Sequence, residues 1–260
     1  MIKTTKKVIL ILFSIMGISF LLWLVIFFNP SLFYANQTHF DKITIFHNQK
    51  LDEKTEVVIK DVLKLLKSSE LYDKNLNIQL CLNDNKIYPI FHITHGQPVA
   101  YSIFNKTIIK NGKIKFNENV AEVQWPGTNE LRKYNLTMLL AHEFTHNLQR
   151  NANFFYVLRT GLGKINWKLE GNADYISRGF KNDGRLKDKI EKYLIEENNE
   201  HNGLPAIKDE FGSYLTKGYY KYALIVQYLI EIKKMNFNQI CELDTNVHEI
   251  YSEMLDWKSD

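Results

Sequence analysis

The stretch Leu139-Leu140-Ala141-His142-Glu143-Phe144-Thr145-His146-Asn147-Leu148 decides how the rest of the chain is interpreted, because it contains the spacing HExxH. In a helix, His142 and His146 lie one turn apart and differ by only about 40° of rotation, so both imidazoles can reach one ion. Neutral imidazole suits zinc, and a site with three protein ligands leaves a fourth position for a water. Glu143 lies beside the first histidine and is the expected base for that water. The alternative is a surface helix that carries two unrelated histidines.

The helix around this motif is expected to begin at Leu131 or Asn135 and to run to about Arg150. Apolar residues nearly surround it: Leu136, Met138, Leu139, Leu140, Ala141, Phe144 and Leu148. A helix that is apolar on almost every side is buried. The motif is therefore predicted to lie in the interior of the fold.

The N-terminal stretch differs from the rest of the chain. Residues 8–28 carry no charge and are mostly Ile, Leu, Phe and Val, which is about the length that spans a bilayer as a helix. Lysines precede this stretch, and the next charged residue is Asp41, so the positive-inside rule predicts a cytoplasmic N-terminus. A cleaved secretory signal is the alternative, but it usually has a shorter apolar region and a small-residue cleavage site.

The expected organisation follows from that anchor. Residues 1–7 are predicted to be a cytoplasmic tail, 8–28 a transmembrane anchor, 29–50 a tether, and 51–260 an extracytoplasmic catalytic domain. The chain would then be a single-pass protein of the cell membrane, with the lipid bilayer as one partner.

Charge argues against a nucleic-acid partner. Removing the three N-terminal lysines from the 33 basic residues leaves 30 against 29 acidic ones, so the outer portion is nearly neutral. No basic patch interleaved with aromatic residues is visible. Cys81 and Cys241 could form a disulfide or remain two buried thiols, and the sequence leaves both possibilities open.

Hydrophobic periodicity predicts strands first and helices afterwards. A helix is expected over residues 51–71, and β-like runs over 77–82, 99–104, 107–110, 113–116 and 120–125. Asn111-Gly112 predicts a hairpin between the third and fourth of these runs. Further helices are expected over 166–180, 185–197, 217–234 and 246–257. This order predicts an α+β fold, with a small and mainly antiparallel sheet lobe followed by a helical lobe that carries the helix with the HExxH motif.

Two histidines do not hold a catalytic zinc alone, so a third ligand is needed. The extended spacing HExxHxxGxxH is excluded, because Gln149 and Ala152 stand where its Gly and His would fall. Glu170 follows His146 after twenty-three intervening residues, enough to leave the motif helix and to pack a second helix against it. Asp174, one turn beyond Glu170, could accept the free ring N–H of a zinc-bound histidine.

Two features of the second helix qualify this picture. Asp174 has an alternative partner in Arg178, four residues later, with which it could form an ordinary helical ion pair. Gly171 and Ala173 are small and would let the two helices approach closely.

With these residues in place, the chain resembles the gluzincins, the thermolysin-like and aminopeptidase-N-like zinc peptidases. The matching residues are 142–146 and the block Glu170-Gly171-Asn172-Ala173-Asp174-Tyr175. The resemblance implies a peptide or protein substrate, with His142, His146 and Glu170 as zinc ligands, Glu143 as general base, and Asp174 as the residue that orients a ligand.

The family also has a Tyr or His that stabilises the oxyanion, and the strand over 120–125 would be the sheet edge along which an extended peptide lies. Tyr214 is the expected donor, and its competitors are Tyr219, Tyr220, Tyr222 and His201. Residues 122–127 do not match the exopeptidase segment of the family, so endopeptidase and exopeptidase activity both stay open.

A second class of function competes with the peptidase. The chain could be a membrane-anchored binding or assembly module in which zinc is structural or the peptidase is inactive. A structural zinc site normally has four protein ligands and no adjacent acid. Glu143 would have no purpose in such a site, which favours the hydrolase.

Overall fold

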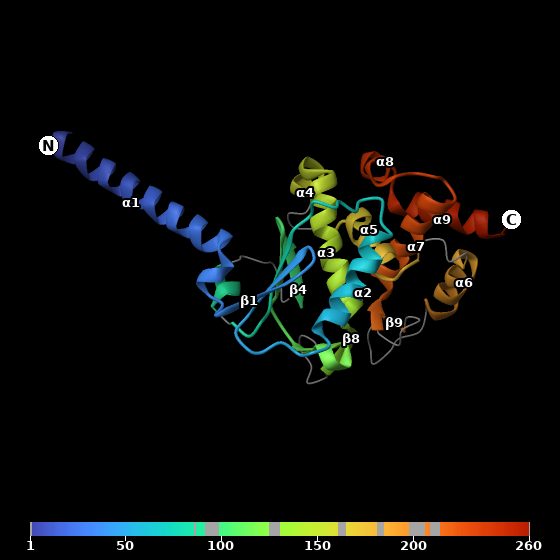
Figure 1. Cartoon of the computed structure of the whole chain (residues 1–260). Coiled ribbons are helices and arrows are strands. Elements are labelled where there is room, and N and C mark those ends of the chain that lie inside the picture. The colour runs from blue at the N-terminus through green and yellow to red at the C-terminus, as the bar shows by residue number, and fades with distance from the viewer. Residues whose placement is uncertain are drawn as a thin grey trace.

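The computed structural model describes residues 2–85, 87–91, 99–124, 131–160, 165–180, 185–197, 206–208 and 214–259. The N-terminal helix α1 (Ile2–Phe28) extends away from the body of the protein (Figure 1). Its segment Ile11–Phe28 is long and apolar enough to cross a membrane. This helix confirms the expected N-terminal span in its length and composition.

The end of α1 packs directly on the body. The Tyr88 hydroxyl donates a hydrogen bond of 2.9 Å to the carbonyl of Phe27, and the ring centroids of Phe28 and Phe104 lie 5.3 Å apart. The Lys106 ammonium lies 5.0 Å from the centroid of the Phe28 ring, a cation–π contact. The direction in which α1 leaves the body is therefore set by several side-chain contacts.

The segment expected as a tether is part of the folded body. It contains a single turn of 3-10 helix, η1 (Pro30–Leu32), and the antiparallel strands β1 (Asn36–Phe40) and β2 (Ile43–His47). Every residue of β2 is buried, because it is an inner strand of the main sheet. The expectation of a tether is therefore wrong from residue 36 onward.

The main sheet is mixed rather than mainly antiparallel, and this part of the expectation is wrong. Its five strands have the order β1-β2-β3-β5-β4, with β3 (Ile78–Cys81), β4 (Ala100–Ile103) and β5 (Lys106–Ile109). The β2/β3 and β3/β5 pairs are parallel, whereas β1/β2 and β4/β5 are antiparallel. Helix α2 (Thr55–Lys67) connects β2 to β3, and such a crossover makes a parallel pair possible. Strand β4 is left at one edge.

The Asn111-Gly112 pair does not form the expected hairpin. Strand β5 before it belongs to the main sheet, whereas β6 (Lys113–Lys115) after it pairs with β7 (Val120–Gln124) in a second sheet. Gly112 has a φ of +94°, so this glycine is used where the chain passes from one sheet to the other. The hairpin that does form joins β4 to β5 through Phe104, whose φ is +53°.

The second sheet also corrects the expected substrate edge. Its order is β6-β7-β8, with β8 (Leu131–Asn135), and all its pairs are antiparallel. Strand β7, the expected edge, is therefore the middle strand, while Trp125 lies outside the described residues. A separate two-stranded sheet joins β9 (Ala206–Lys208) and β10 (Tyr214–Thr216).

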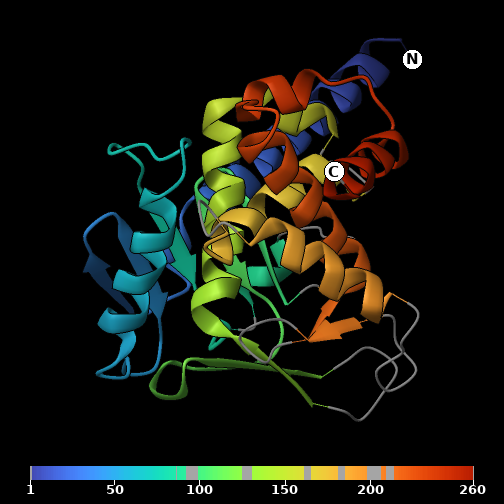
Figure 2. The same cartoon turned by 90° about the vertical axis from the view of Figure 1, so that its right-hand side faces the viewer.

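Helices make up most of the second half of the chain. They are α3 (Leu136–Ala152), α4 (Phe154–Thr160), α5 (Trp167–Ser177), α6 (Leu186–Glu196), α7 (Lys217–Glu231), α8 (Phe237–Glu242) and α9 (Val247–Ser259). The expected helices are all present, whereas α4 and α8 were not predicted. Figure 2 shows α3 between α2 with the main sheet on one side and the orange and red helices on the other. The predicted α+β class is confirmed.

Two buried free thiols settle the cysteine question. Cys81 lies on β3 and Cys241 on α8, and both are free. They belong to separate apolar clusters of the described structure. No disulfide joins them.

Candidate metal centre

Helix α3 brings the two histidines and the glutamate to one cleft. It begins at Leu136, because the side chain of Asn135 caps it by accepting a 3.1 Å hydrogen bond from the Met138 amide. Of the two expected starting points, Asn135 is thus the correct one. Phe144, which is fully buried, fixes the opposite face of α3 against the core, so the motif face looks into the cleft.

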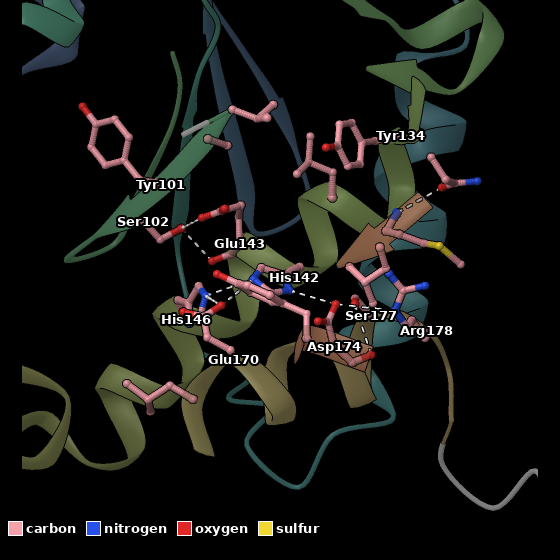
Figure 3. A pocket seen from close by; sticks show the side chains of 18 of the residues that line it. Tyr101, Ser102, Tyr134, His142, Glu143, His146, Glu170, Asp174, Ser177 and Arg178 are labelled. Atoms are coloured by element: carbon pink, nitrogen blue, oxygen red, sulfur yellow. Dashed lines mark hydrogen bonds and ion pairs between the residues drawn. The ribbon is translucent and has the colours of Figure 1, made fainter. Parts of the chain in front are cut away.

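Three donor atoms meet at one point between α3 and α5. The Nε2 atoms of His142 and His146 are 3.2 Å apart, and the Oε2 atom of Glu170 lies 3.2 Å from the first and 3.6 Å from the second. A tetrahedral zinc with bonds of about 2.1 Å requires ligand separations of about 3.4 Å. Figure 3 shows the three side chains converging from the two helices. The donor set and its spacing both fit zinc, and these three residues form the only such group in the described part of the chain.

Charge around these donors also suits a cation. Burial raises the pKa of Glu170, but His146 and hydrogen bonds to both histidines lower it more, so its pKa lies well below the usual range. Burial lowers the pKa of His142, whereas Asp174 and Glu170 raise it well above its ordinary value. Burial also lowers the pKa of His146, but Glu170 raises it more, so this pKa too lies above its ordinary value. The site therefore favours a positive charge, whether protons or a metal supply it.

Asp174 contacts the far nitrogen of the first histidine. Its Oδ1 atom lies 3.2 Å from Nδ1 of His142, and its side chain is only 4% exposed. The Nε atom of Arg178 lies 3.5 Å from the same oxygen. Both partners expected for Asp174 are therefore present together, and the arginine adds a second positive charge beside the carboxylate.

Gln149 contacts the far ring nitrogen of the second histidine, and this residue was not predicted from the sequence. Nδ1 of His146 lies 2.8 Å from Oε1 of Gln149. The amide nitrogen of Gln149 donates to the carbonyl of Leu169, at 2.8 Å, and to Asn172, at 3.0 Å. Because the amide must donate to α5, its oxygen accepts, and His146 carries its proton on Nδ1 with Nε2 free for a metal. The i,i+3 spacing on α3 was a signal for this contact.

Ser102 on β4 holds the candidate base and was also missed. Its hydroxyl lies 2.6 Å from the carbonyl oxygen of Glu143, 3.1 Å from the Oε2 atom of Glu143, and 2.7 Å from Thr107. Glu143 is only 8% exposed, and burial raises its pKa although His146 and His142 lower it. Figure 3 shows the Glu143 side chain between Ser102 and the two histidines. No local signal in the sequence brings β4 to this place.

These groups line a cleft of about 530 Å³. Its walls include β4 on one side and α3 and α5 on the other, with Tyr219 of α7 facing His142 at 6.4 Å between ring centroids. Burial, followed by the charges of Glu170, Asp174 and Glu143, raises the pKa of Tyr219 strongly, so its hydroxyl keeps its proton. Tyr214 begins β10, but its side chain, like all of His201, lies outside the described residues.

Gly171 is needed for a different contact from the one expected. A Cβ atom at this position would lie 2.5 Å from the carbonyl oxygen of Tyr222 and 2.9 Å from Cγ2 of Val226. Both residues belong to α7, so the close approach is between α5 and α7 rather than between α5 and α3. Gly171 therefore lets α5, which also carries Glu170, pack closely against α7.

Comparison of the chain with models of known protein families, with curated proteins and with solved structures finds no match. The chemistry of the cleft therefore rests on its own geometry. Two imidazoles and a carboxylate converge on one point, a buried carboxylate lies beside them, and a phenol faces them across an open cleft. These are the parts that hydrolysis with a metal-bound water requires.

Proposed function

We propose that this protein is a membrane-anchored zinc-dependent peptidase of the gluzincin type, which hydrolyses peptide bonds outside the cytoplasm. One observation carries the proposal: the donor atoms of His142, His146 and Glu170 have the mutual separations of a tetrahedral zinc site, and they face a cleft beside Glu143. Three protein ligands are typical of a catalytic zinc, whose remaining position stays open for water or substrate.

The residues of the chain divide the chemical work. A bound zinc would lower the pKa of a water toward about 7 and polarise the scissile carbonyl. The Glu143 carboxylate accepts the proton of the attacking water and then donates it to the departing amine. Burial raises the pKa of Glu143, which brings it closer to that of the groups with which it exchanges the proton. Ser102 keeps the carboxylate turned toward the cleft.

Tyr219 is the residue we assign to the oxyanion. It lines the cleft and faces His142, and its raised pKa keeps the hydroxyl protonated and able to donate a hydrogen bond. The donor expected from the resemblance, Tyr214, has its side chain outside the described residues and stays a prediction, so we assign the role to Tyr219 among the described side chains.

An extended peptide is the substrate that suits the cleft. Strand β4 is an edge strand of the main sheet, and residues 99–102 line the cleft. An edge strand offers unpaired backbone groups to which a peptide can add as a further strand. A substrate bound in this way would pass between β4 and the metal ligands, with its scissile carbonyl near Glu143.

The orientation across the membrane follows from α1. Lysines lie on the N-terminal side of the apolar segment and none follows it before Lys42, so we assign the N-terminus to the cytoplasm and the cleft to the other side. Full-length protein should be tested, since removing the chain up to residue 36 would cut into β1.

The experiment compares three variants of the full chain in lipid nanodiscs. Zinc content is measured by elemental analysis, and cleavage is measured on a peptide library. Glu143→Gln should retain zinc and lose about 10²- to 10⁴-fold in kcat, the range that a general base contributes. Glu170→Gln should lose both zinc and activity. Glu249→Gln, on the exposed first turn of α9, is the matched control and should change neither.

The outcomes separate the peptidase from its rival. Zinc bound at one equivalent without cleavage of any peptide would favour the structural-zinc module. Cleavage retained by Glu143→Gln would overturn the assigned base. Absence of zinc in the unaltered protein would overturn the metal centre itself.

A further inference from the structure

Helix α4 carries an apolar surface that the body does not use. Val157 is buried and Tyr156 packs beside it, while the opposite face of the helix points outward. We call that outward face the α4 patch: Phe154 at 43% exposure, Phe155 at 82% and Leu158 at 51%. A cluster of large exposed apolar side chains marks an interaction surface.

Helix α4 begins close to the place where α1 joins the body. The contacts of Phe27 and Phe28 with Tyr88 and Phe104 hold the end of α1 against the body. Arg150, near the end of α3, donates a hydrogen bond to the carbonyl of the same Phe104, and α4 follows α3 after a single residue. A bilayer crossed by α1 would therefore begin near α4.

One exposed basic side chain of the described structure stands beside the α4 patch. Arg150 instead lines the cleft and donates to the carbonyls of Phe104 and Ser102, and Lys168 is buried, with its ammonium donating to carbonyls of the α8 region. Arg159, in the last turn of α4, is exposed beside the apolar residues. Exposed apolar side chains beside arginine are the pattern of helices that lie in the interface of anionic membranes.

We propose that the α4 patch is a second membrane contact, which inserts into the surface of the same bilayer that α1 crosses. Insertion would remove Phe155 and Leu158 from water and bring Arg159 to the level of the anionic headgroups. The protein would then be held at two places, by α1 beside the main sheet and by α4 at the end of α3.

The two contacts would fix the cleft relative to the membrane. Helix α3 runs along the cleft from β8 to α4, and Val157 of α4 lines the end of the cleft next to Leu169. In this arrangement the α4 end of the cleft would lie nearest to the bilayer surface. If the proposed peptidase function holds, the preferred substrates are peptide segments that lie next to the membrane, such as the first extracytoplasmic residues of lipid-anchored or membrane-spanning polypeptides.

Spin labels test the contact without any need for catalysis. The full chain carries a nitroxide at Phe155→Cys or, as the control, at Leu131→Cys, which is 65% exposed on β8 at the other end of the cleft. The native thiols of Cys81 and Cys241 are buried and should not react. The measured quantity is the ratio of the collision rate of the label with oxygen to its collision rate with a water-soluble nickel chelate. In vesicles of phosphatidylcholine and phosphatidylglycerol, this ratio should be several-fold higher at position 155 than at position 131.

Two results would overturn the membrane contact. Equal ratios at the two positions would show that α4 stays in water. Dipolar broadening between labels at position 155 would show that a second copy of the chain covers the patch instead.

A cleavage assay tests the consequence for substrates. Phe155→Ser should lower the rate of cleavage of a lipid-tethered peptide on these vesicles several-fold. The rate of cleavage of the same peptide free in solution should stay unchanged. Ile195→Ser, which removes another largely exposed apolar side chain, from α6, should change neither rate. An equal loss on both peptides would overturn the membrane-adjacent substrate class. Lack of cleavage by the unaltered protein would overturn the peptidase proposal alone, because the spin labels still decide the contact.

Discussion

The two walls of the cleft hold their functional groups in different ways. On the helical wall, α3 and α5 present His142, His146 and Glu170 at helical spacings, and further side chains bind the far side of each imidazole. On the strand wall, one hydroxyl of β4, that of Ser102, reaches Glu143. The helical wall is fixed by many contacts within it, whereas the position of the base depends on a strand from another part of the fold. Changes on the two walls should therefore have effects of different kind and size.

The strongest dependence expected of the helical wall is on pH. The raised pKa values of His142 and His146 mean that zinc must displace protons from both rings. Below these pKa values, each displaced proton should lower the zinc affinity by up to about tenfold for every pH unit. For the two histidines together, the affinity should fall by up to about a hundredfold per pH unit. Glu170, with its lowered pKa, stays ionised and does not contribute to the pH dependence of the zinc affinity. Chelator competition at pH 6 and pH 8 measures this, and an affinity independent of pH would contradict it.

The sign of the accompanying stability effect can be worked out. In the metal-free protein, the raised histidine pKa values contribute stability that is complete below about pH 6.5 and is lost as pH rises through those values. Zinc binding improves over the same range. The difference in thermal midpoint between zinc-loaded and EDTA-treated protein should therefore widen with rising pH.

Asp174→Asn should have the next largest effect. It distinguishes the role of this carboxylate beside His142 from its ion pair with Arg178. The amide keeps the size of the side chain but loses the charge that orients His142 and makes it a better ligand. Zinc affinity should fall by about 10- to 100-fold. Asp188→Asn, on the exposed side of α6, is the control. If the ion pair with Arg178 were the only role of Asp174, the variant would lose thermal stability while zinc affinity stayed unchanged.

What could be predicted from the sequence follows the same division. His142 and His146 lie on one helix, so their spacing alone places them together. Glu170 could be anticipated because it follows His146 after twenty-three residues, enough for a second helix to pack back, and because its segment matches the family block. Ser102 stands 41 residues before Glu143 in a segment whose pattern indicates only a strand. Its position at the edge, against α3, depends on the order of strands in the sheet.

The errors in the fold have a related cause. Strand β2 was taken as part of a tether, because a short apolar run soon after the apolar N-terminal helix carries no sign of the partners that bury it. The Asn111-Gly112 pair indicates a turn, and a turn is present, but local sequence does not say which sheet each flanking strand joins. Non-local pairing decides both cases. The six helices predicted from local periodicity are all present, whereas the short helices α4 and α8 were missed.

Gly171→Ala tests the scaffold behind the helical wall. The added methyl group would lie 2.5 Å from the backbone oxygen of Tyr222, so α5 and α7 must move apart. Overpacking of this kind costs about 1–3 kcal/mol, from which the better helix propensity of alanine subtracts up to about 1 kcal/mol. The thermal midpoint should fall, and zinc should bind more weakly as Glu170 is displaced. Gly218→Ala, where no atom lies within 4 Å, is the control. Equal thermal midpoints for the two variants would show that α7 can move away from the added methyl group without loss of stability.

Ser102→Ala should have the smallest effect, and it isolates the strand wall. The hydroxyl makes no contact with the three candidate ligands, so zinc content and KM should stay unchanged. The Glu143 carboxylate would lose a hydrogen bond worth about 0.5–1.5 kcal/mol, so kcat should fall by roughly two- to tenfold. Ser252→Ala, which removes an exposed hydroxyl from α9, is the control. Ser102→Thr retains the hydroxyl and should recover most of kcat. A kcat that stays low with threonine would mean that β4 positions the substrate rather than the base.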